Sequence, residues 1–287
     1  MRPIKRKNRW RACGESVQGA SHIRAGLGNQ DAIDWEPKNS RGLPILLAVA
    51  DGHGSARYFR SATGAVLAVQ TALGLLRQFG ESLRGKPATV IKRAAESLPR
   101  ALVDEWVKRV EQHQDQQPFS QDELATLEAR ANAASVEEVQ KRPVLAYGAT
   151  LVAVYADQAS LVYVQLGDGD IVTVSQSGDV SRPLPQDHRL IANETTSLCS
   201  PEAWRDVRTA FQPATEEPPA LILLSTDGYA NSFRTDEGFL QVGRDIQQML
   251  KRRRGDETVR REMRGWLNEA SKAGSGDDVT LGLLWRC

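Results

Sequence analysis

The chain has 287 residues, and its 37 basic and 36 acidic side chains leave a formal net charge of +1. A field this close to neutral gives no reason to expect a nucleic acid or another polyanion as a partner. Cys13, Cys199 and Cys287 are far apart and form no CxxC pair, which argues against a disulfide framework or a zinc knuckle. We therefore expect one domain over residues 1–287, in a reducing compartment.

The amino-terminal segment, residues 1–9, is basic, and no apolar signal core follows it. We interpret it as a mobile, solvated arm rather than a surface that binds nucleic acid or acidic lipid. No later segment has the roughly eighteen uninterrupted apolar residues that a membrane span needs. These features predict a cytoplasmic protein without a membrane partner.

Short apolar runs bounded by glycine, proline or acidic residues predict the strands. The first run lies at residues 43–50. The runs at 148–156 and 160–178 are broken by Asp-Gly and Ser-Gly turn signals, and we interpret them as antiparallel hairpins. Residues 221–229 and 277–285 predict two more strands, one ending and one beginning at acidic residues.

Apolar residues recur at intervals of three and four over residues 56–78 and 88–113, which predicts helices that pack on sheet faces. Two late helices are expected over 236–253 and 257–272, with the basic run at 251–254 exposed to solvent. Because the strands form hairpins rather than alternating βαβ units, the order of elements predicts a layered α+β fold.

Residues 111–143 are expected to form a polar loop followed by a helix within the same domain. The loop is assigned to the glutamine-rich residues 111–117. Ser120 stands three residues before Glu123, which is the spacing of a capping box and predicts a helix start.

Acidic residues recur at the ends of separate apolar strands: Asp31, Asp51, Asp168, Asp227, and Asp277 with Asp278. A single acid beside a glycine is usually a turn residue, but several brought together would repel one another strongly. A carboxylate cluster with few histidines selects hard divalent ions such as Mg²⁺ or Mn²⁺. Gly52 has no Cβ, so its carbonyl can approach an ion as a further ligand. Two such ions sharing a bridging carboxylate would activate water for attack on phosphorus.

Six motifs, in this order, resemble those of the metal-dependent serine/threonine protein phosphatases of type 2C, the PPM family, in a bacterial branch. They read VQGASHIRAGLGNQDA, LAVADGHGSA, GATLVAVYA, VQLGDGD, LLSTDGYANSF and GSGDDVTLGLL, and they span residues 17–284. The resemblance implies an α+β fold in which an antiparallel β-sandwich is flanked on both faces by helices. It also implies that the metals lie at one end of the sandwich.

The resemblance also implies roles by position. Asp51 corresponds to the acid that bridges two metals, and Gly52 to the carbonyl ligand. Asp227 and Asp277 correspond to the remaining carboxylate ligands, Asp31 to an acid at or beside the metals, and Asp168 to the acid that holds a third, weaker metal. His53 corresponds to a histidine proposed as the general acid.

The chain departs from the usual family pattern at several positions. Gln30 replaces a glutamate before Asp31, which removes one negative charge and is expected to weaken metal binding. Gly26 stands where the family has its phosphate-binding arginine, so Arg24, two residues earlier, is the candidate for that role. Asp170 replaces a basic residue, and Asp278 stands where asparagine is commoner.

The resemblance predicts hydrolysis of phosphoserine and phosphothreonine in proteins by a metal-bridging hydroxide, without a phosphoenzyme, in signalling with a partner serine/threonine kinase. No cysteine lies in a phosphate-cradling loop and no GxxxxGK[ST] motif occurs, which disfavours a cysteine-based phosphatase and an NTPase. Two alternatives stay open. One is a pseudophosphatase that binds a phosphoprotein without turnover, and the other is a hydrolase of small phosphate esters or nucleotides.

Overall fold

The apolar run at Ile45–Ala50 forms strand β3, and all of its residues are buried. Leu46 and Ala48 on one face belong to a hydrophobic cluster shared with helices, whereas Leu47 and Val49 on the other belong to a cluster between two sheets. A strand covered on both faces needs no polar alternation, which explains the continuous apolar run.

The computed structural model describes residues 10–185, 187, 196–213 and 217–287. The basic arm expected at residues 1–9 lies outside the described residues. The strands are β1 (Trp10–Val17), β2 (Ala32–Glu36), β3 (Ile45–Ala50), β4 (Leu151–Ala156), β5 (Ser160–Leu166), β6 (Asp170–Val174), β7 (Val180–Ser181), β8 (Arg208–Pro213), β9 (Leu221–Ser225) and β10 (Val279–Arg286).

The strands form two antiparallel sheets, one in the order β1-β10-β9-β6-β7 and the other in the order β2-β3-β4-β5-β8. The helices are α1 (Ala20–Ala25), α2 (Ser61–Ser82), α3 (Ala88–Ala95), α4 (Leu98–Gln116), α5 (Gln121–Arg130), α6 (Ala133–Lys141), α7 (Asp227–Ala230), α8 (Asp236–Leu250) and α9 (Gly255–Ala273), with 3-10 turns η1 (Ala56–Tyr58), η2 (Pro143–Tyr147) and η3 (Ala203–Arg205).

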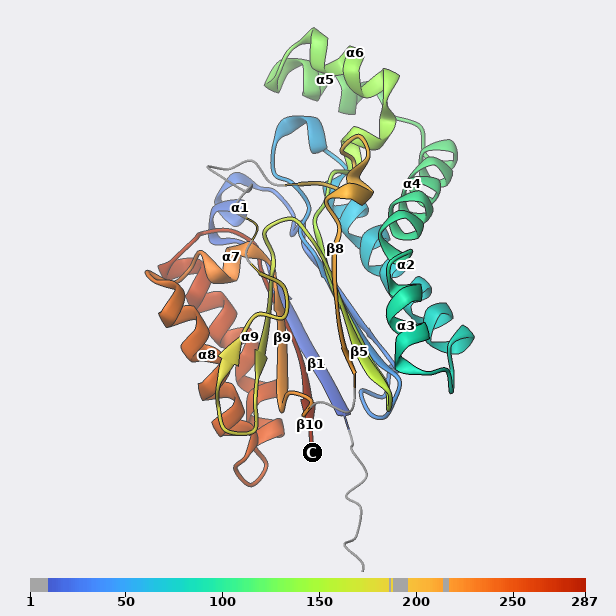
Figure 1. Ribbon diagram of the computed structural model, residues 1–287. Coiled ribbons are helices and arrows are strands. Elements are labelled where there is room, and N and C mark those ends of the chain that lie inside the picture. Colours follow the sequence, from blue (N-terminus) through green and yellow to red (C-terminus); the bar gives the residue numbers. More distant parts are fainter. Residues whose placement is uncertain (1–9, 186, 188–195, 214–216) are drawn as a thin grey trace, which may run out of the picture.

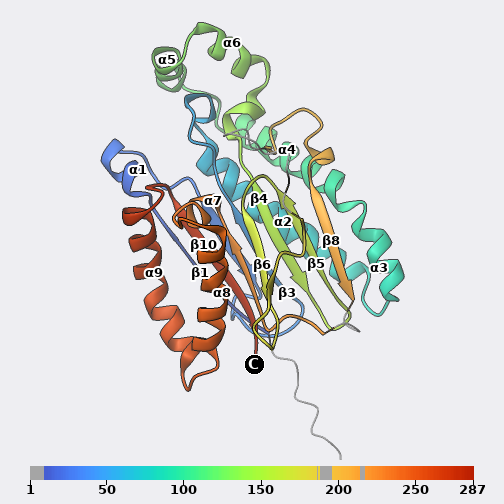
Figure 2. The same ribbon diagram turned by 60° about the vertical axis from the view of Figure 1, so that its left-hand side comes forward.

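The sheets face each other, and helices cover both outer faces (Figure 1). Helices α8 and α9 lie on the β1 sheet, and α2 packs on β2, β3 and β4 of the other sheet (Figure 2). The predicted α+β sandwich with flanking helices is confirmed. Among the described residues, no helix combines the length and the apolar composition needed to span a bilayer.

The strands that the sequence did not predict are β1, β2, β7 and β8, which are the edge strands of the two sheets. Their side chains are partly exposed at many positions, as in β8, where none is fully buried. An edge strand lacks a neighbour on one side and so carries no continuous apolar run. The central strands were predicted because burial on both faces imposes such a run.

One predicted hairpin is wrong. Strands β5 and β6 flank an Asp-Gly pair, but β5 pairs with β4 and β8, whereas β6 pairs with β9 and β7 in the opposite sheet. The Gly167–Asp168 turn therefore carries the chain from one sheet to the other. The hairpin β4–β5 is antiparallel, as predicted, and β6 also pairs antiparallel with β7, a strand that was not predicted.

The predicted helix over 88–113 is two helices, α3 and α4, and α4 packs mainly on α2 rather than on a sheet face. Pro99 explains the break, because proline is tolerated in the first turn of a helix but not in its interior. The predicted loop at 111–117 is also wrong, since α4 continues to Gln116. Glutamine favours helix, and polarity alone does not make a loop.

The other helix predictions are met with shifted ends. The segment predicted as helix from residue 56 begins as the turn η1, and α2 starts at Ser61. Residues 251–254 form an exposed turn between α8 and α9, so the basic run is solvated as expected. The capping box at α5 is present, with Ser120 and Glu123 each accepting a hydrogen bond from the other's backbone N–H.

Arg60 anchors the α5–α6 segment to the rest of the domain. Its guanidinium donates to both carboxylate oxygens of Glu123, at 2.7 and 2.9 Å, and to Tyr147 Oη at 2.7 Å. The same group lies 4.7 Å from the centre of the Phe119 ring. Its backbone N–H donates to Ala146, so one residue connects the start of α2 to η2 and α5. In both views α5 and α6 stand at the same end of the molecule as α1 (Figure 1 and Figure 2).

The Arg60–Glu123 pair predicts a pH-dependent stability. The hydrogen bond from Arg60 is the main cause that lowers the Glu123 pKa from 4.5 to about 2. A lowered folded-state pKa stabilises the protein above the unfolded-state pKa, and that contribution is lost as the pH falls. We expect Glu123→Gln to lower the free energy of unfolding by about 1–2 kcal/mol at pH 7, and by progressively less as the pH falls from 4.5 towards 2.

Urea denaturation of both proteins across this pH range measures the difference. Glu137→Gln is the matched control, because Glu137 pairs with Lys141 on the exposed face of α6 and should change stability by less than about 0.5 kcal/mol. Equal losses in the two variants would mean that the Arg60 pair anchors nothing.

Candidate metal site

The register of the two sheets brings the ends that carry the acidic residues to one end of the sandwich. In one sheet Ala32 pairs with Ala50, so the turns with Asp31 and Asp51 lie side by side. In the other sheet Ser225 pairs with Leu281, so Asp227 and Asp277 lie at neighbouring strand ends. Antiparallel pairing is what allows the end of one strand and the beginning of the next to meet there.

Asp31 joins the two sheets at this end. Its Oδ2 accepts hydrogen bonds from Thr226 Oγ1 at 2.8 Å and from Thr280 Oγ1 at 2.6 Å, both in the opposite sheet. Its other carboxylate oxygen, Oδ1, is buried and has no hydrogen-bond partner among the residues that the structure describes. Burial is the main cause that raises the Asp31 pKa, and the charges of Asp278 and Asp227 add to it. A buried carboxylate oxygen without a donor is costly unless something positive binds it.

Asp51 has the most strongly acidic surroundings. Its pKa is raised well above the usual range, first by burial and then by the charges of Asp31, Asp227 and Asp277. The backbone of Asp51 is fixed by reciprocal contacts with Thr150, since Asp51 N–H donates to Thr150 Oγ1 and Thr150 N–H donates to the Asp51 carbonyl. The carboxylates expected around the bridging position are therefore electrostatic neighbours.

Gly52 is required by the closeness of the surrounding chain. A Cβ at this position would lie 2.7 Å from the Gln30 carbonyl oxygen and 2.8 Å from the Ser61 carbonyl oxygen. Real Cβ atoms do not approach so closely, and any other residue would push these segments apart. The glycine thus allows the Asp51 turn to lie against the first motif and the start of α2.

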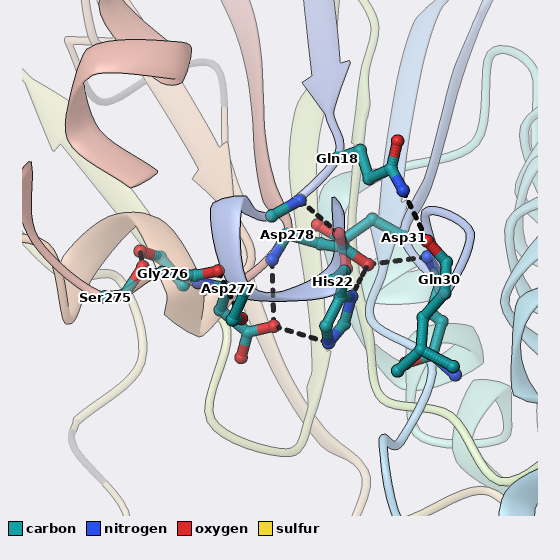
Figure 3. A network of polar contacts seen from close by, with 12 residues as sticks. Gln18, His22, Gln30, Asp31, Ser275, Gly276, Asp277 and Asp278 are labelled. Carbon is teal, nitrogen blue, oxygen red and sulfur yellow. Dashed lines mark hydrogen bonds and ion pairs between the residues drawn. The ribbon is translucent and has the colours of Figure 1, made fainter. Parts of the chain in front are cut away.

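Asp277 and Asp278 precede β10 and have different surroundings (Figure 3). The Asp277 side chain is about half exposed, whereas that of Asp278 is almost fully buried. Asp278 accepts backbone hydrogen bonds from Gly19 and Gln30, each at 2.6 Å. Asp278 therefore fastens both ends of the first motif to the last motif.

Asp227 occupies the first turn of the short helix α7, where the helix dipole favours a negative charge. Its Oδ2 accepts a hydrogen bond from Asn231 Nδ2 at 3.0 Å. Gly228 follows, and a Cβ there would lie 2.1 Å from the Asp278 carbonyl oxygen. The glycine therefore lets α7 lie directly against the loop that carries Asp277.

His53 lies beside this cluster. Burial lowers its pKa from 6.5 to about 4, and the nearby charge of Asp227 opposes that shift only in part. The centre of its ring lies 4.9 Å from the centre of the Tyr58 ring. The backbone N–H of His53 donates to the Gly148 carbonyl. A Cβ at position 148 would overlap both rings, so Gly148 makes the room in which His53 lies.

Two predicted site residues are less closely tied to the cluster. Asp168 lies in the turn that crosses from β5 to β6, at the same end of the sandwich, but the charges that act most on Asp51 come from other residues. Arg24 is exposed on α1, next to the residues that bind the last motif. Their roles as a third metal ligand and a phosphate-binding residue remain predictions.

The departures from the family pattern have local consequences. Asp170 forms a salt bridge with Arg182 at 2.6 Å, and Arg182 also binds Asp236 at the start of α8. Asp170 stands where many family members have a basic residue, and Arg182 supplies the positive charge beside it. Gln30 donates from Nε2 to Ser61 Oγ at 3.0 Å, so its side chain holds the start of α2.

Sequence reasoning missed Thr226, Thr280, Gly148 and His22. The threonines act on Asp31 across the sandwich, a contact that spacing along the chain does not reveal. His22 is one of only four histidines and lies in the same motif as Gln30 and Asp31, so the sequence did offer a signal that it belongs to the site. Its Nδ1 lies 3.0 Å from Asp278 Oδ2, and its Nε2 lies 3.5 Å from Asp277 Oδ1.

Solved structures resemble the whole chain. PppA, a regulatory component of T6SS in Pseudomonas aeruginosa, is 19% identical, with a TM-score of 0.53 over 97% of this chain and 98% of that one. The serine/threonine phosphatase Stp1 from Staphylococcus aureus is 14% identical, with a TM-score of 0.57 over 96% and 94%. The Mycobacterium tuberculosis serine/threonine phosphatase PstP/Ppp is 19% identical, with a TM-score of 0.52 over 96% and 98%.

At these identities the solved structures establish the fold. No curated protein matches the chain. The family model described as protein phosphatase 2C matches residues 18–268, which include every acidic residue of the cluster up to Asp227. The motifs, the sandwich and this match agree, and the chain therefore belongs to the protein phosphatase 2C family, the family of protein serine/threonine phosphatases.

Proposed function

We propose that this protein hydrolyses phosphoserine and phosphothreonine in proteins by direct attack of metal-activated water, without a phosphoenzyme. One observation carries the proposal. The charges that act most strongly on Asp51 all come from other carboxylates, those of Asp31, Asp227 and Asp277. Such a cluster is stable at neutral pH only if protons or cations balance it, and a phosphatase of this family needs cations there.

The residues fit a pair of divalent ions. Asp31 Oδ1 is a buried oxygen with no donor in the described part of the chain, and the turn at Gly52 has no room for a Cβ, so its backbone is closely surrounded. The donor set of Asp51, Gly52, Asp227 and Asp277 consists of oxygen atoms, which Mg²⁺ and Mn²⁺ prefer. Asp168 would contribute to a third, weaker ion from its turn between the sheets.

Bound at this site, the divalent ions supply an activated water as the nucleophile and neutralise the charge on the phosphate. The chain's own residues do the rest. Asp31, held by Thr226 and Thr280, keeps the two sheet ends at a fixed separation. Arg24 on α1 would bind the phosphate through its guanidinium. His53, packed between Tyr58 and Gly148, would donate a proton to the leaving oxygen from its protonated form, which its lowered pKa of about 4 makes a small fraction of the protein at neutral pH.

The proposed substrate is a protein that a serine/threonine kinase has phosphorylated in the bacterial cytoplasm. Stp1 and PstP are described as serine/threonine phosphatases and PppA as a regulatory component, which supports a regulatory phosphoprotein as the substrate. A pseudophosphatase is the second candidate, because Gln30 replaces an acid and no arginine stands at position 26. The intact set of Asp51, Asp227 and Asp277 favours turnover.

Activity should depend on added metal. We expect phosphopeptide and p-nitrophenyl phosphate hydrolysis with Mn²⁺ or Mg²⁺, and none in excess chelator, because the nucleophile requires the bound ion. Asp227→Asn should reduce kcat at least a hundredfold at saturating Mn²⁺, while Asp245→Asn, an exposed acid on α8, should leave it unchanged. Full turnover in chelator would exclude the metal mechanism, and no turnover with either ion would support the pseudophosphatase.

Removing a carboxylate should stabilise the metal-free protein. The raised Asp51 pKa means that ionising this group opposes folding, so the metal-free wild type loses stability as the pH rises above about 4. Asp51→Asn avoids this cost and should raise the thermal midpoint in chelator at pH 7.5 by about 3 °C or more, with a smaller gain at pH 4.

Thermal unfolding with and without Mn²⁺ tests this expectation. Mn²⁺ should stabilise the wild type much more than Asp51→Asn, because the variant has lost a ligand. A variant that is less stable than the wild type in chelator would show that Asp51 is not under net repulsion.

His53→Gln should discriminate between leaving groups. A phenol or serine alkoxide needs a proton to leave, whereas p-nitrophenolate leaves without one. We expect the variant to hydrolyse phenyl phosphate at least about tenfold more slowly relative to the wild type, with a much smaller loss on p-nitrophenyl phosphate. Kinetics on both esters at saturating Mn²⁺ make the comparison, and equal losses would give His53 a structural role only.

A further inference from the structure

His22 faces the proposed metal site without a role in it. It lies on α1, and its Nε2 is 3.5 Å from Oδ1 of Asp277, a proposed ligand (Figure 3). His22, Asp277 and Asp278 offer ligand atoms that all lie within 4.8 Å of one another. Among the described residues this is the one group of three or more His, Cys, Asp or Glu side chains whose ligand atoms lie so close together.

The helix that carries His22 is fixed against the loop before β10. Ser21 N–H donates to the Gly276 carbonyl at 2.8 Å, and Ala20 N–H donates to Ser271 Oγ at 2.9 Å. At Gly19, a Cβ would lie 2.5 Å from the carbonyl carbon of Asp277, so the two segments touch. These contacts fix the backbone that carries His22 beside the loop that carries Asp277.

Asp278 sets the orientation of the imidazole. Its carboxylate is almost fully buried and is held by the backbone N–H groups of Gly19 and Gln30. His22 Nδ1 is buried and lies 3.0 Å from Asp278 Oδ2, and it has no aligned hydrogen bond to any described residue. An N–H on Nδ1 would face this carboxylate, and Nε2, 3.5 Å from Asp277 Oδ1, would then carry the lone pair.

The arrangement matches a general feature of protein metal sites. A histidine that binds a metal through one ring nitrogen almost always offers its other N–H to a carboxylate, which fixes the ring and raises its basicity. Here Asp278 is the carboxylate behind the ring, and Asp277 is the acidic ligand in front of it. An imidazole nitrogen at this position would add a ligand atom without adding another carboxylate to the cluster.

We propose that His22 Nε2 is a metal ligand beside Asp277, with Asp278 as the carboxylate that orients it. This rests on the metal site of the proposed function and deepens it, because it adds a nitrogen donor to an oxygen set. Imidazole suits zinc and other later transition ions, whereas Mg²⁺ strongly prefers oxygen. This chain should therefore favour Zn²⁺ over Mg²⁺ more than its carboxylates alone would.

Pulsed electron paramagnetic resonance of the Mn²⁺-loaded protein tests the ligand directly. The metal-free protein is titrated with Mn²⁺, and a ¹⁴N coupling of a directly bound imidazole is expected in the wild type. Labelling histidine with ¹⁵N should change that coupling, which needs no variant and so does not depend on folding. The coupling should persist in His53→Gln and vanish in His22→Gln.

A ligand and a mere positioning residue differ in metal selectivity. His22→Gln should weaken Zn²⁺ binding about tenfold and Mg²⁺ binding less than about threefold. The matched control is Ile23→Gln, since Ile23 is the neighbouring residue on α1, is 58% exposed, and should change neither constant. Calorimetry measures both constants on protein without phosphoester.

The outcomes are separable. A wild type without histidine coupling at every Mn²⁺ occupancy overturns the proposal, as does coupling that persists in His22→Gln. Equal weakening of both metals, without coupling, would instead make His22 a residue that only positions Asp277. None of these measurements uses turnover, so an inactive enzyme would not affect the test of His22. Likewise, the absence of a ¹⁴N coupling from His22 would not contradict the proposed phosphatase reaction.

Discussion

Electrostatic repulsion among the carboxylates at one end of the sandwich is the main constraint on the structure around them. Asp31 and Asp51 on one sheet meet Asp227 and Asp277 on the other, and burial raises the pKa of Asp31, Asp51 and Asp277. Each like charge disfavours the ionised form of its neighbours. The fold must therefore hold these groups together against their own charges.

It does so with neutral donors rather than with basic side chains. Thr226 and Thr280 donate to Asp31 from the opposite sheet, and the backbone N–H groups of Gly19 and Gln30 donate to Asp278. Such donors stabilise a carboxylate without neutralising it. The net negative charge of the site is left for a cation, so the protein trades stability in the absence of metal for a site prepared to bind it.

Close approach of backbone segments is the second requirement. Gly52 lies against Gln30 and Ser61, and Gly228 lies against Asp278, with no space for a side chain at either position. These contacts connect four of the six motifs through the main chain. A shift in any one of these motifs would move the acidic residues in the others, because protein interiors are close-packed and transmit such shifts.

Charge reversals within the motifs are compensated where they occur. Asp170 is paired with Arg182, which also reaches Asp236 and so ties β6 to the start of α8.

At the other side of the site, Arg60 on the segment after Asp51 binds Glu123 on α5. The α5–α6 segment is thus connected to the chain that carries Asp51 and His53, at the end of the molecule where the substrate would bind.

The sequence by itself determined the central strands, the fold class and the identity of the acidic residues. Continuous apolar runs such as Ile45–Ala50 require burial on both faces, and an acid at the end of each run is visible by its position alone. The ordered motifs then indicated the family. The edge strands carried no such run and were therefore not predicted. The sequence also did not predict that a helix starts at Leu98 and continues to Gln116, because these ends depend on competing local preferences.

Only the tertiary structure decided which residues meet. The crossing of the chain from β5 to β6 between sheets, the contacts of Asp31 with Thr226 and Thr280, and the approach of His22 to Asp277 all join residues distant in the sequence. Local periodicity reports burial along one element, but it contains no information on which element lies opposite. That depends on packing two sheets face to face, and this packing places His22 beside Asp277, a proposed metal ligand.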